Sequence, residues 1–231
     1  MAEHDRPVDP NKMQLAILAA SKHHVRSFAD LGACWGVNAG YSIGLLDSFP
    51  IDLGFVVDQT VTSLSRERGK KFPQLQFVTG LLGDTDVISN IPSLDALLMY
   101  DILLHQVAPN WDDFLTRWSK KARVLVIYNQ MWAQTEKTIR FIERGVEWYK
   151  KNVYHTNSQT IDEWFRTLDE TDPATRRKRR NLHQFWQFGI TTNDLTNHLQ
   201  KLGYRLDFFK SYGPFVPTYP WIQNEGFIFV R

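Results

Sequence analysis

The amino-acid sequence predicts an α/β fold built on a doubly wound sheet, with one helical insertion. Five short apolar runs rich in β-forming residues alternate with helical stretches. The runs are almost continuously apolar, as expected when helices cover both faces of a parallel sheet. The chain has 231 residues, 43% of them hydrophobic and 23% charged, which suits one large domain with its own core. We therefore predict a single domain over residues 1–231.

The predicted elements follow one another from the N-terminus. Residues 9–24 are expected to form a helix that Asp9 caps and Pro10 begins. The five strands are expected in the runs SFADL, LGFVVD, QFVTG, DALLMYD and RVLVIY. Near the C-terminus, TTNDLTNHLQKLG is expected to form an amphipathic helix with Gly203 in its C-terminal cap. The runs YRLDFFKSY and EGFIFVR are expected to be two closing strands, which makes seven strands in all.

Residues 133–190 contain three helical patterns and no convincing strand. The first pattern, TEKTIRFIERGVEWYKK, has one apolar face. The second, TIDEWFRTLDE, opens with a capping box formed by Thr160 and Glu163. The third, DPATRRKRRNLHQFWQF, starts with Asp172 and Pro173 as cap and first turn. We predict a helical insertion that serves as a lid over the substrate entrance.

The composition excludes several kinds of site and partner. A formal net charge of +2 is too small to indicate nucleic acid by itself. The single cysteine, Cys34, excludes an intrachain disulfide and a cysteine-cluster zinc site, and we expect it to pack as a small apolar side chain. No metal site is predicted. The N-terminal residues show no apolar signal region and no run of 18 apolar residues occurs, so we predict a cytoplasmic protein that does not enter a membrane.

The stretch SFADLGACWGVNAG, residues 27–40, predicts a ligand-binding turn after the first strand. Sheets of this kind bind ligands at the carboxyl ends of their strands, and Asp30 and Asp58 each end a strand. Gly32 lets the backbone turn sharply and lets a ligand approach closely. The glycine spacing does not match a dinucleotide-binding loop, and no phosphate-binding P-loop motif occurs. The alternative is a glycine turn that only connects strand to helix.

This turn and the later segments resemble the class I S-adenosylmethionine-dependent methyltransferases. FADLGACWGVNAG is similar to the first motif of that family, and GFVVDQ is similar to the second. SLDALLMYDILLHQVAPNWDDFL and KKARVLVIYN are similar to its fourth strand with the following helix and to its fifth strand. The closing helix and two strands are similar to the family's ending. The resemblance covers nearly all of the chain except residues 133–190, and it implies a Rossmann-like, mostly parallel sheet with an antiparallel last strand.

The resemblance implies S-adenosylmethionine as the cofactor. Gly32 and its neighbours would contact the methionine part, Asp58 would hold the ribose, and Asp30 would organise the turn. The implied cofactor-binding residues are Asp30, Gly32, Ala33, Gly36, Asp58, Gln59, Leu81, Leu82 and Tyr100. The chain departs from the family where a bulkier ACW replaces further glycines. It also departs after the third strand, where a leucine pair stands in place of an acid, so backbone groups and apolar contact would hold the adenine there.

Methyl transfer from this cofactor requires a nucleophile aligned with the methyl carbon and, for a hydroxyl acceptor, a group that takes its proton. The candidate catalytic residues are His105, just past the fourth strand, and His183, in the insertion. Both histidines also have a plain packing explanation. Trp186 and Tyr128 are the candidate substrate-binding residues.

We predict a methyltransferase that acts on a small-molecule acceptor, at oxygen rather than nitrogen, with a natural-product or sugar-type substrate. The run MYDILLHQ lacks the N/D-P-P-Y motif of adenine-methylating enzymes. Two alternatives stay open: an RNA-modifying methyltransferase that uses the basic run from Arg176 to Arg180, and a non-catalytic cofactor-binding protein. The modest net charge argues against a nucleic-acid partner, and a homodimer is compatible with the sequence.

Overall fold

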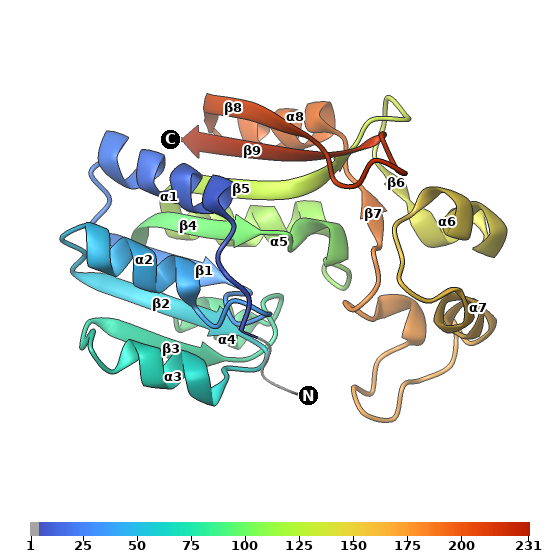
Figure 1. Ribbon diagram of the computed structural model, residues 1–231, viewed down its shortest axis with the longest axis horizontal. Coiled ribbons are helices and arrows are strands. Elements are labelled where there is room, and N and C mark those ends of the chain that lie inside the picture. The colour runs from blue at the N-terminus through green and yellow to red at the C-terminus, as the bar shows by residue number, and fades with distance from the viewer. Residues whose placement is uncertain (1–4) are drawn as a thin grey trace.

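The computed structural model describes residues 5–231 and contains the predicted α/β sheet (Figure 1). Residues 1–4, the start of the predicted domain, lie outside the described residues. The seven strands lie in the order β3-β2-β1-β4-β5-β9-β8. Their bounds are β1 (Ser27–Leu31), β2 (Leu53–Asp58), β3 (Leu75–Thr79), β4 (Leu94–Tyr100), β5 (Ala122–Trp132), β8 (Arg205–Pro214) and β9 (Ile222–Val230). Strands β1 to β5 pair in parallel, and β9 pairs antiparallel with both β5 and β8. The antiparallel last strand is therefore confirmed.

Helices cover both faces of the sheet, as a doubly wound fold requires (Figure 1). One face carries α1 (Pro10–Lys22), α2 (Gly40–Ser48) and α3 (Ser63–Gly69), and the other carries α4 (Thr85–Ser89), α5 (Trp111–Trp118) and α8 (Thr192–Lys201). Successive strand residues alternate between the two cores: Phe28 packs on the side of α1 and Ala29 packs on the side of α5. Both residues are fully buried, which explains why the strands lack a polar face.

The two terminal helices begin and end as the sequence predicts. The Asp9 carboxylate accepts the N–H of Asn11 at 2.8 Å, and Pro10 is the first residue of α1. The side chain of Thr191 accepts the N–H of Asp194 at the start of α8. Past the end of that helix, Gly203 has φ +87, a left-handed conformation that favours glycine.

Residues 133–190 contain less helix than predicted and two short strands that were not predicted. Strand β5 continues beyond Tyr128 to Trp132. The following elements are β6 (Ile139–Arg140), the 3₁₀ turn η3 (Phe141–Arg144), α6 (Val146–Asn152), α7 (Ser158–Arg166), the 3₁₀ turn η4 (Arg179–Asn181) and β7 (Phe188–Gly189), with β6 and β7 paired. Their buried side chains form a separate, largely aromatic core that includes Phe141, Tyr149 and Trp164.

Three predictions in this segment are wrong for local reasons. The first predicted helix is interrupted at Gly145, which has φ +84, so that only α6 remains helical. The second helix starts earlier than expected, because the side chain of Asn157, and not Thr160, caps it. The third does not form: the Asp172 carboxylate accepts both the N–H and the hydroxyl of Thr175 at 2.8 Å, and a turn closes there instead.

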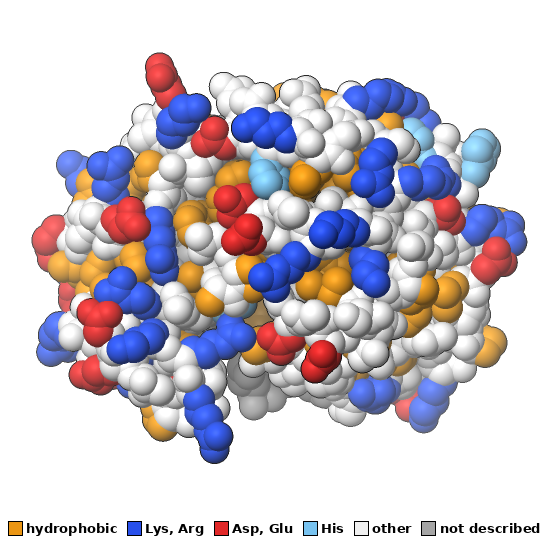
Figure 2. All heavy atoms as spheres, turned by 180° about the vertical axis from the view of Figure 1, so that it is seen from behind, with side chains coloured by type: hydrophobic (Ala, Val, Ile, Leu, Met, Phe, Trp, Pro, Cys, Tyr) orange, Lys and Arg blue, Asp and Glu red, His pale blue; other side chains and the backbone are white. Residues whose placement is uncertain are grey.

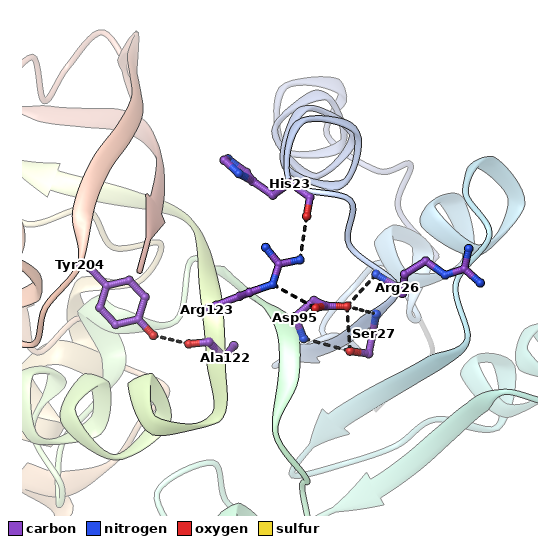
Figure 3. Close-up of polar contacts among 7 residues, drawn as sticks. All are labelled: His23, Arg26, Ser27, Asp95, Ala122, Arg123 and Tyr204. Carbon is purple, nitrogen blue, oxygen red and sulfur yellow. Dashed lines mark hydrogen bonds and ion pairs between the residues drawn. The ribbon is translucent and has the colours of Figure 1, made fainter.

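The amino ends of the central strands are joined by one carboxylate, that of Asp95 in β4 (Figure 3). One of its oxygens accepts the N–H of Arg26 at 2.8 Å and both the N–H and the hydroxyl of Ser27, at 3.0 and 3.1 Å. The other oxygen accepts the Nε–H of Arg123 at 3.1 Å. Although partial burial raises the pKa of Asp95, these hydrogen bonds outweigh it and hold that pKa below its usual value. This network lies opposite the carboxyl edge, where parallel sheets bind ligands.

We expect Asp95→Ala to lower the free energy of unfolding by about 1–3 kcal/mol at pH 7, because it leaves several donors without their acceptor. Since the folded-state pKa of Asp95 is lowered, its contribution is present above the unfolded pKa near 4 and is lost as the pH falls below it. Urea denaturation at pH 7 and pH 3 measures both effects. Asp52→Ala is the matched control, because Asp52 is 64% exposed and its ion-pair partner within residues 5–231 is the exposed Arg26. Equal losses in the two variants would contradict this role for Asp95.

Candidate active site

The carboxyl ends of β1 and β2 are connected through Asp58. Its carboxylate accepts the N–H of Cys34 at 2.8 Å and the N–H of Thr60 at 2.9 Å. The N–H of Gly32 donates to the Val57 carbonyl at 2.8 Å, which fixes the turn against β2. Burial raises the pKa of Asp58, although the backbone donors oppose that effect. The structure thus brings together the two strand ends that the sequence singles out.

Gly32 has φ +73, and its Cα faces apolar side chains at short range. A Cβ at this position would lie 2.8 Å from Cγ2 of Ile102 and 3.9 Å from Cδ1 of Leu82. Any side chain there would therefore clash and would also strain the backbone. Ile102 was not identified from the sequence, and its only signal was its position two residues after the end of β4.

The rest of the turn is bulkier than a glycine-rich loop. The side chain of Cys34 is buried, and its sulfur accepts the Ser65 hydroxyl at 3.3 Å. Burial raises the pKa of this thiol to about 11, which agrees with the expected packing role. Trp35 is 76% exposed. Gly36 has φ +75, and its carbonyl accepts the N–H of Arg6 at 2.6 Å, so the segment before α1 lies on the turn.

Asp30 is buried at the end of β1 and accepts the Ser42 hydroxyl at 2.8 Å. Burial raises its pKa to about 7, the Ser42 hydroxyl opposes this rise, and the charge of Asp58 adds to it. A carboxyl group that titrates near neutrality, at a strand end beside a ligand-binding turn, is typical of a functional position. It is also costly to the fold when it is ionised.

The other predicted cofactor residues lie along the same edge with different surroundings. Gln59 is exposed directly after β2, and Leu81 is half-buried in the loop after β3, where its carbonyl accepts the N–H of Asp84. Ala33 is buried inside the turn. The Tyr100 hydroxyl donates to the carbonyl of Lys12 at 3.2 Å, and its ring lies against α1 and α2. The cofactor contacts of these residues stay predictions.

The two candidate histidines lie near each other but differ in their partners. His105 closes the 3₁₀ turn η1 (Leu103–His105), and its Nδ1 lies 2.9 Å from the carbonyl of Phe185. Because a carbonyl only accepts, Nδ1 carries the hydrogen and Nε2 is the basic nitrogen. Burial lowers the pKa of His105 below 6.5, so the ring is neutral at pH 7.

His183 follows η4 and is held by protein groups. Its Nε2 accepts from Nη1 of Arg177 at 3.1 Å, and its ring also hydrogen-bonds the backbone of Val107. Burial and the positive charge of Arg177 lower the pKa of His183 to about 4. Arg177 in turn lies 3.8 Å from the carboxylate of Asp84, which connects this segment to the loop after β3.

A polar cluster that the sequence did not reveal lies at the ends of β4, β5 and β9. The Asp101 carboxylate forms an ion pair with the Lys12 ammonium and accepts Nε2 of Gln130 at 2.8 Å. Gln130 also donates to Asn224 at 3.2 Å. Asp101 has φ +55, a strained backbone conformation for a residue with a side chain. The Lys12 ammonium lies 5.0 Å from the centre of the Tyr128 ring, so the predicted substrate residue Tyr128 borders this cluster.

Four half-buried rings, here called the aromatic cluster, contact one another: Tyr154, Trp186, Phe215 and Tyr219. The Tyr154 ring centre lies 5.8 Å from that of Trp186 and 5.0 Å from that of Phe215. Trp186 presents its ring edge-on to His105 at 6.5 Å. The predicted substrate residue Trp186 is therefore joined to rings of the loop between β8 and β9.

The basic run from Arg176 to Arg180 is largely occupied by contacts within the protein. Its contacts are Arg177 with Asp84, Lys178 with the Asp169 carbonyl, Arg179 with Glu163, and Arg180 with the Asp169 carboxylate. Acidic and basic side chains are interspersed over the face of the molecule that Figure 2 shows. An electrostatic nucleic-acid surface would instead gather unpaired cations on one side.

The comparisons with known proteins match the fold but no sequence family. No family model matches the chain, and no curated protein matches it by sequence. A Burkholderia thailandensis 1,6-didemethyltoxoflavin-N1-methyltransferase, solved with 1,6-didemethyltoxoflavin and S-adenosylhomocysteine, is 12% identical with a TM-score of 0.60, over 96% of this chain and 79% of that one. Mitomycin 7-O-methyltransferase is 12% identical with a TM-score of 0.52, over 96% of this chain and 54% of that one.

A putative RNA methyltransferase from Pyrococcus horikoshii is 14% identical with a TM-score of 0.56, over 99% of this chain and 87% of that one. Among residues 5–231, no helix has the length and apolar character needed to cross a membrane. Identities this low establish the architecture only. The chain has the Rossmann-like fold of the class I S-adenosylmethionine-dependent methyltransferases, with its strand order and its antiparallel closing strand.

Proposed function

We propose that this protein is an S-adenosylmethionine-dependent methyltransferase that methylates a hydroxyl group of a small molecule. The observation that carries the proposal is the turn after β1, where Gly32 is confined by Ile102 and Leu82 and where Asp58 fixes Cys34. A Cβ at Gly32 would lie 2.8 Å from Cγ2 of Ile102, so only glycine lets the backbone turn this tightly past the end of β4. The carboxylate of Asp58 accepts from the backbone of Cys34, Thr60 and Gln59 and still retains a lone pair, which suits a hydroxyl group of a ribose.

The residues at this edge would divide the cofactor between them. Asp58 and the exposed Gln59 would hold the ribose, Leu81, Leu82 and Ile102 would contact the adenine side, and the turn from Gly32 to Gly36 would face the methionine part. The bound cofactor supplies an electrophilic methyl group on a sulfonium. The protein then has to orient the acceptor, exclude water and remove the acceptor's proton.

His105 is the better of the two histidines for accepting that proton. Its Nδ1 donates to the Phe185 carbonyl and the ring also hydrogen-bonds the backbone of His183, which fixes its orientation, and Nε2 is the nitrogen without the hydrogen. In His183, by contrast, Nε2 already accepts from Arg177, and the lowered pKa of about 4 makes it a weak base. We therefore assign proton acceptance to His105 and assign His183 to holding the segment in place.

The aromatic cluster supports a flat acceptor of small size. Its half-buried rings lie with their centres 5.0–6.3 Å apart, and they present apolar surface to a ligand at low entropic cost. The solved 1,6-didemethyltoxoflavin-N1-methyltransferase holds the small molecule 1,6-didemethyltoxoflavin, and mitomycin 7-O-methyltransferase is another structural neighbour. The contacts made by the basic run count against the RNA alternative.

If His105 accepts the proton, turnover should fall with acid. Because burial lowers its pKa, the acid limb of kcat/KM should have a midpoint below 6.5 and activity should be level near pH 7.5. We expect His105→Asn to lower kcat by about 10²-fold and to abolish that limb. The assay is formation of S-adenosylhomocysteine from S-adenosylmethionine with a panel of flat hydroxyl compounds.

His183→Asn serves as the comparison, since it should affect stability more than the pH profile. A profile that keeps its acid limb in His105→Asn would contradict the assignment. Formation of S-adenosylhomocysteine with RNA, and with none of the small hydroxyl compounds, would contradict the proposed acceptor class.

A further inference from the structure

Lys12 is a nearly buried cation at the edge where an acceptor would enter. Its side chain is only 12% exposed, and it lies in the first turn of α1, over the Tyr128 ring. An ammonium group carries three N–H donors, and among the described residues the Asp101 carboxylate is its only anionic partner. Asp101 remains 36% exposed, so the pair opens toward solvent at the carboxyl edge.

The charge of Asp101 acts on two groups. It forms the ion pair with Lys12, and its negative charge favours the protonated ring of His105. Nε2 of Gln130 also donates to this carboxylate, at 2.8 Å. These side-chain contacts hold Asp101 in its strained backbone conformation. Strained conformations that are held in this way are common at functional sites.

We propose that Lys12 binds the acceptor oxygen and stabilises it as an oxyanion, with Asp101 positioning the ammonium and with the aromatic cluster holding the ring that bears this oxygen. The acceptor class is accordingly a flat aromatic compound with a phenol-type hydroxyl. This inference rests on the proposed function, because it names the acceptor of the same site. Neither Lys12 nor Asp101 was identified from the sequence as a functional residue.

The charges balance through the transfer. Before the proton moves, the negative charge of Asp101 balances the positive charge of Lys12. The His105 ring is uncharged at this stage. The hydroxyl proton then passes to Nε2 of His105, where Asp101 faces the new positive charge, and Lys12 faces the new oxyanion. The oxygen forms its bond to the methyl carbon while the carbon–sulfur bond breaks, and both electrons of that bond stay on the sulfur.

The test uses 4-nitrophenol, a flat phenol whose ionised form is read by its absorbance. We expect the wild-type protein to bind it and to shift its ionisation toward phenolate at least about tenfold relative to free solution, with and without S-adenosylhomocysteine. Lys12→Met should abolish the shift. The matched control is Lys22→Met in the last turn of the same helix, where a half-exposed lysine pairs with Asp207; it should keep the shift.

Two further measurements separate the parts of the site. Trp186→Ala should weaken binding of both 4-nitrophenol and 4-nitroanisole without changing the ionisation of the bound phenol. Lys12→Met should leave the affinity for 4-nitroanisole, which has no hydroxyl group, unchanged. Should Lys12→Met fail to fold, Lys12→Arg retains the positive charge and should retain most of the shift.

Failure of this inference and failure of the proposed function can be told apart. Calorimetry with S-adenosylhomocysteine reports on the cofactor site, whereas the phenol spectrum reports on the Lys12 site. No binding of 4-nitrophenol, an unshifted spectrum in the wild type, or an equal shift in Lys12→Met would each overturn the inference, whatever the calorimetry shows. A shift that depends on Lys12 would support it.

Discussion

Replacing Asp30 with asparagine is expected to raise the free energy of unfolding by roughly 2–4 kcal/mol at pH 8. The folded-state pKa of Asp30 is raised by burial to about 7, whereas the carboxyl group ionises near its ordinary value of 3.8 in the unfolded chain. Between these two values the unfolded state gives up a proton that the folded state keeps. Stability is therefore lost as the pH rises from 4 to 7, and an uncharged asparagine escapes that loss.

The same substitution should weaken cofactor binding, because a buried anion at this edge complements a cofactor that carries positive charge. Urea denaturation of Asp30→Asn and wild type at pH 4, 6 and 8 measures the first effect, and the difference should grow with pH. Asp47→Asn is the control, since Asp47 is exposed and pairs with the exposed Lys71. A gain in stability that does not vary with pH would contradict the buried, titrating carboxyl group.

Asp58→Ala is expected to raise the dissociation constant for S-adenosylhomocysteine by about 10²–10³-fold. The variant loses the charged acceptor of the ribose hydroxyls, at about 1.5–3 kcal/mol for each such hydrogen bond. It also frees the N–H groups of Cys34 and Thr60, so that the turn is less well fixed. Calorimetry of the two proteins measures the loss, and Thr60→Ala, an exposed neighbour, should bind as the wild type does.

A thermodynamic cycle of two proteins and two ligands separates the contact of Asp58 with the ribose from its role in fixing the turn. An S-adenosylhomocysteine analogue without the ribose 2′-hydroxyl should bind the wild type more weakly than the parent compound does. In Asp58→Ala the two ligands should bind alike, because the partner of that hydroxyl is gone. An equal penalty in both proteins would show that Asp58 acts only through the turn.

The sequence was informative wherever a signal is local. A buried parallel strand must be apolar on both faces, so the run LGFVVD could be assigned together with Asp58 at its end. Helix caps are equally local, and Asp9 caps α1 as predicted. The sheet order could follow only from the resemblance, because the partners of a strand are not encoded within it.

The sequence was less informative where a local alternative competes with a helix. Residues 172–175 contain the proline and the acid of a good helix start, yet the Asp172 carboxylate satisfies Thr175 within one turn, and the helix does not follow. Gly145 likewise ends a continuous apolar pattern. The apolar side chains near both places do pack in the aromatic core of this segment, but they do so without a continuous helix.

The candidate site could be predicted only in part from the sequence, because its polar cluster is made by residues that are far apart in the chain. Lys12 and Asp101 are 89 positions apart, and Gln130 and Asn224 are 94 positions apart. No spacing rule connects such pairs, so only the fold reveals them. The homodimer stays a prediction.

The central claim is that the turn after β1 and the carboxylate of Asp58 hold S-adenosylmethionine. The most direct test is calorimetric titration of the wild-type protein with S-adenosylhomocysteine, accompanied by thermal unfolding at the same ligand concentrations. The account predicts saturable binding of one ligand per chain and a melting temperature that rises with ligand concentration. Neither heat nor a shift in melting temperature at high-micromolar ligand would contradict it.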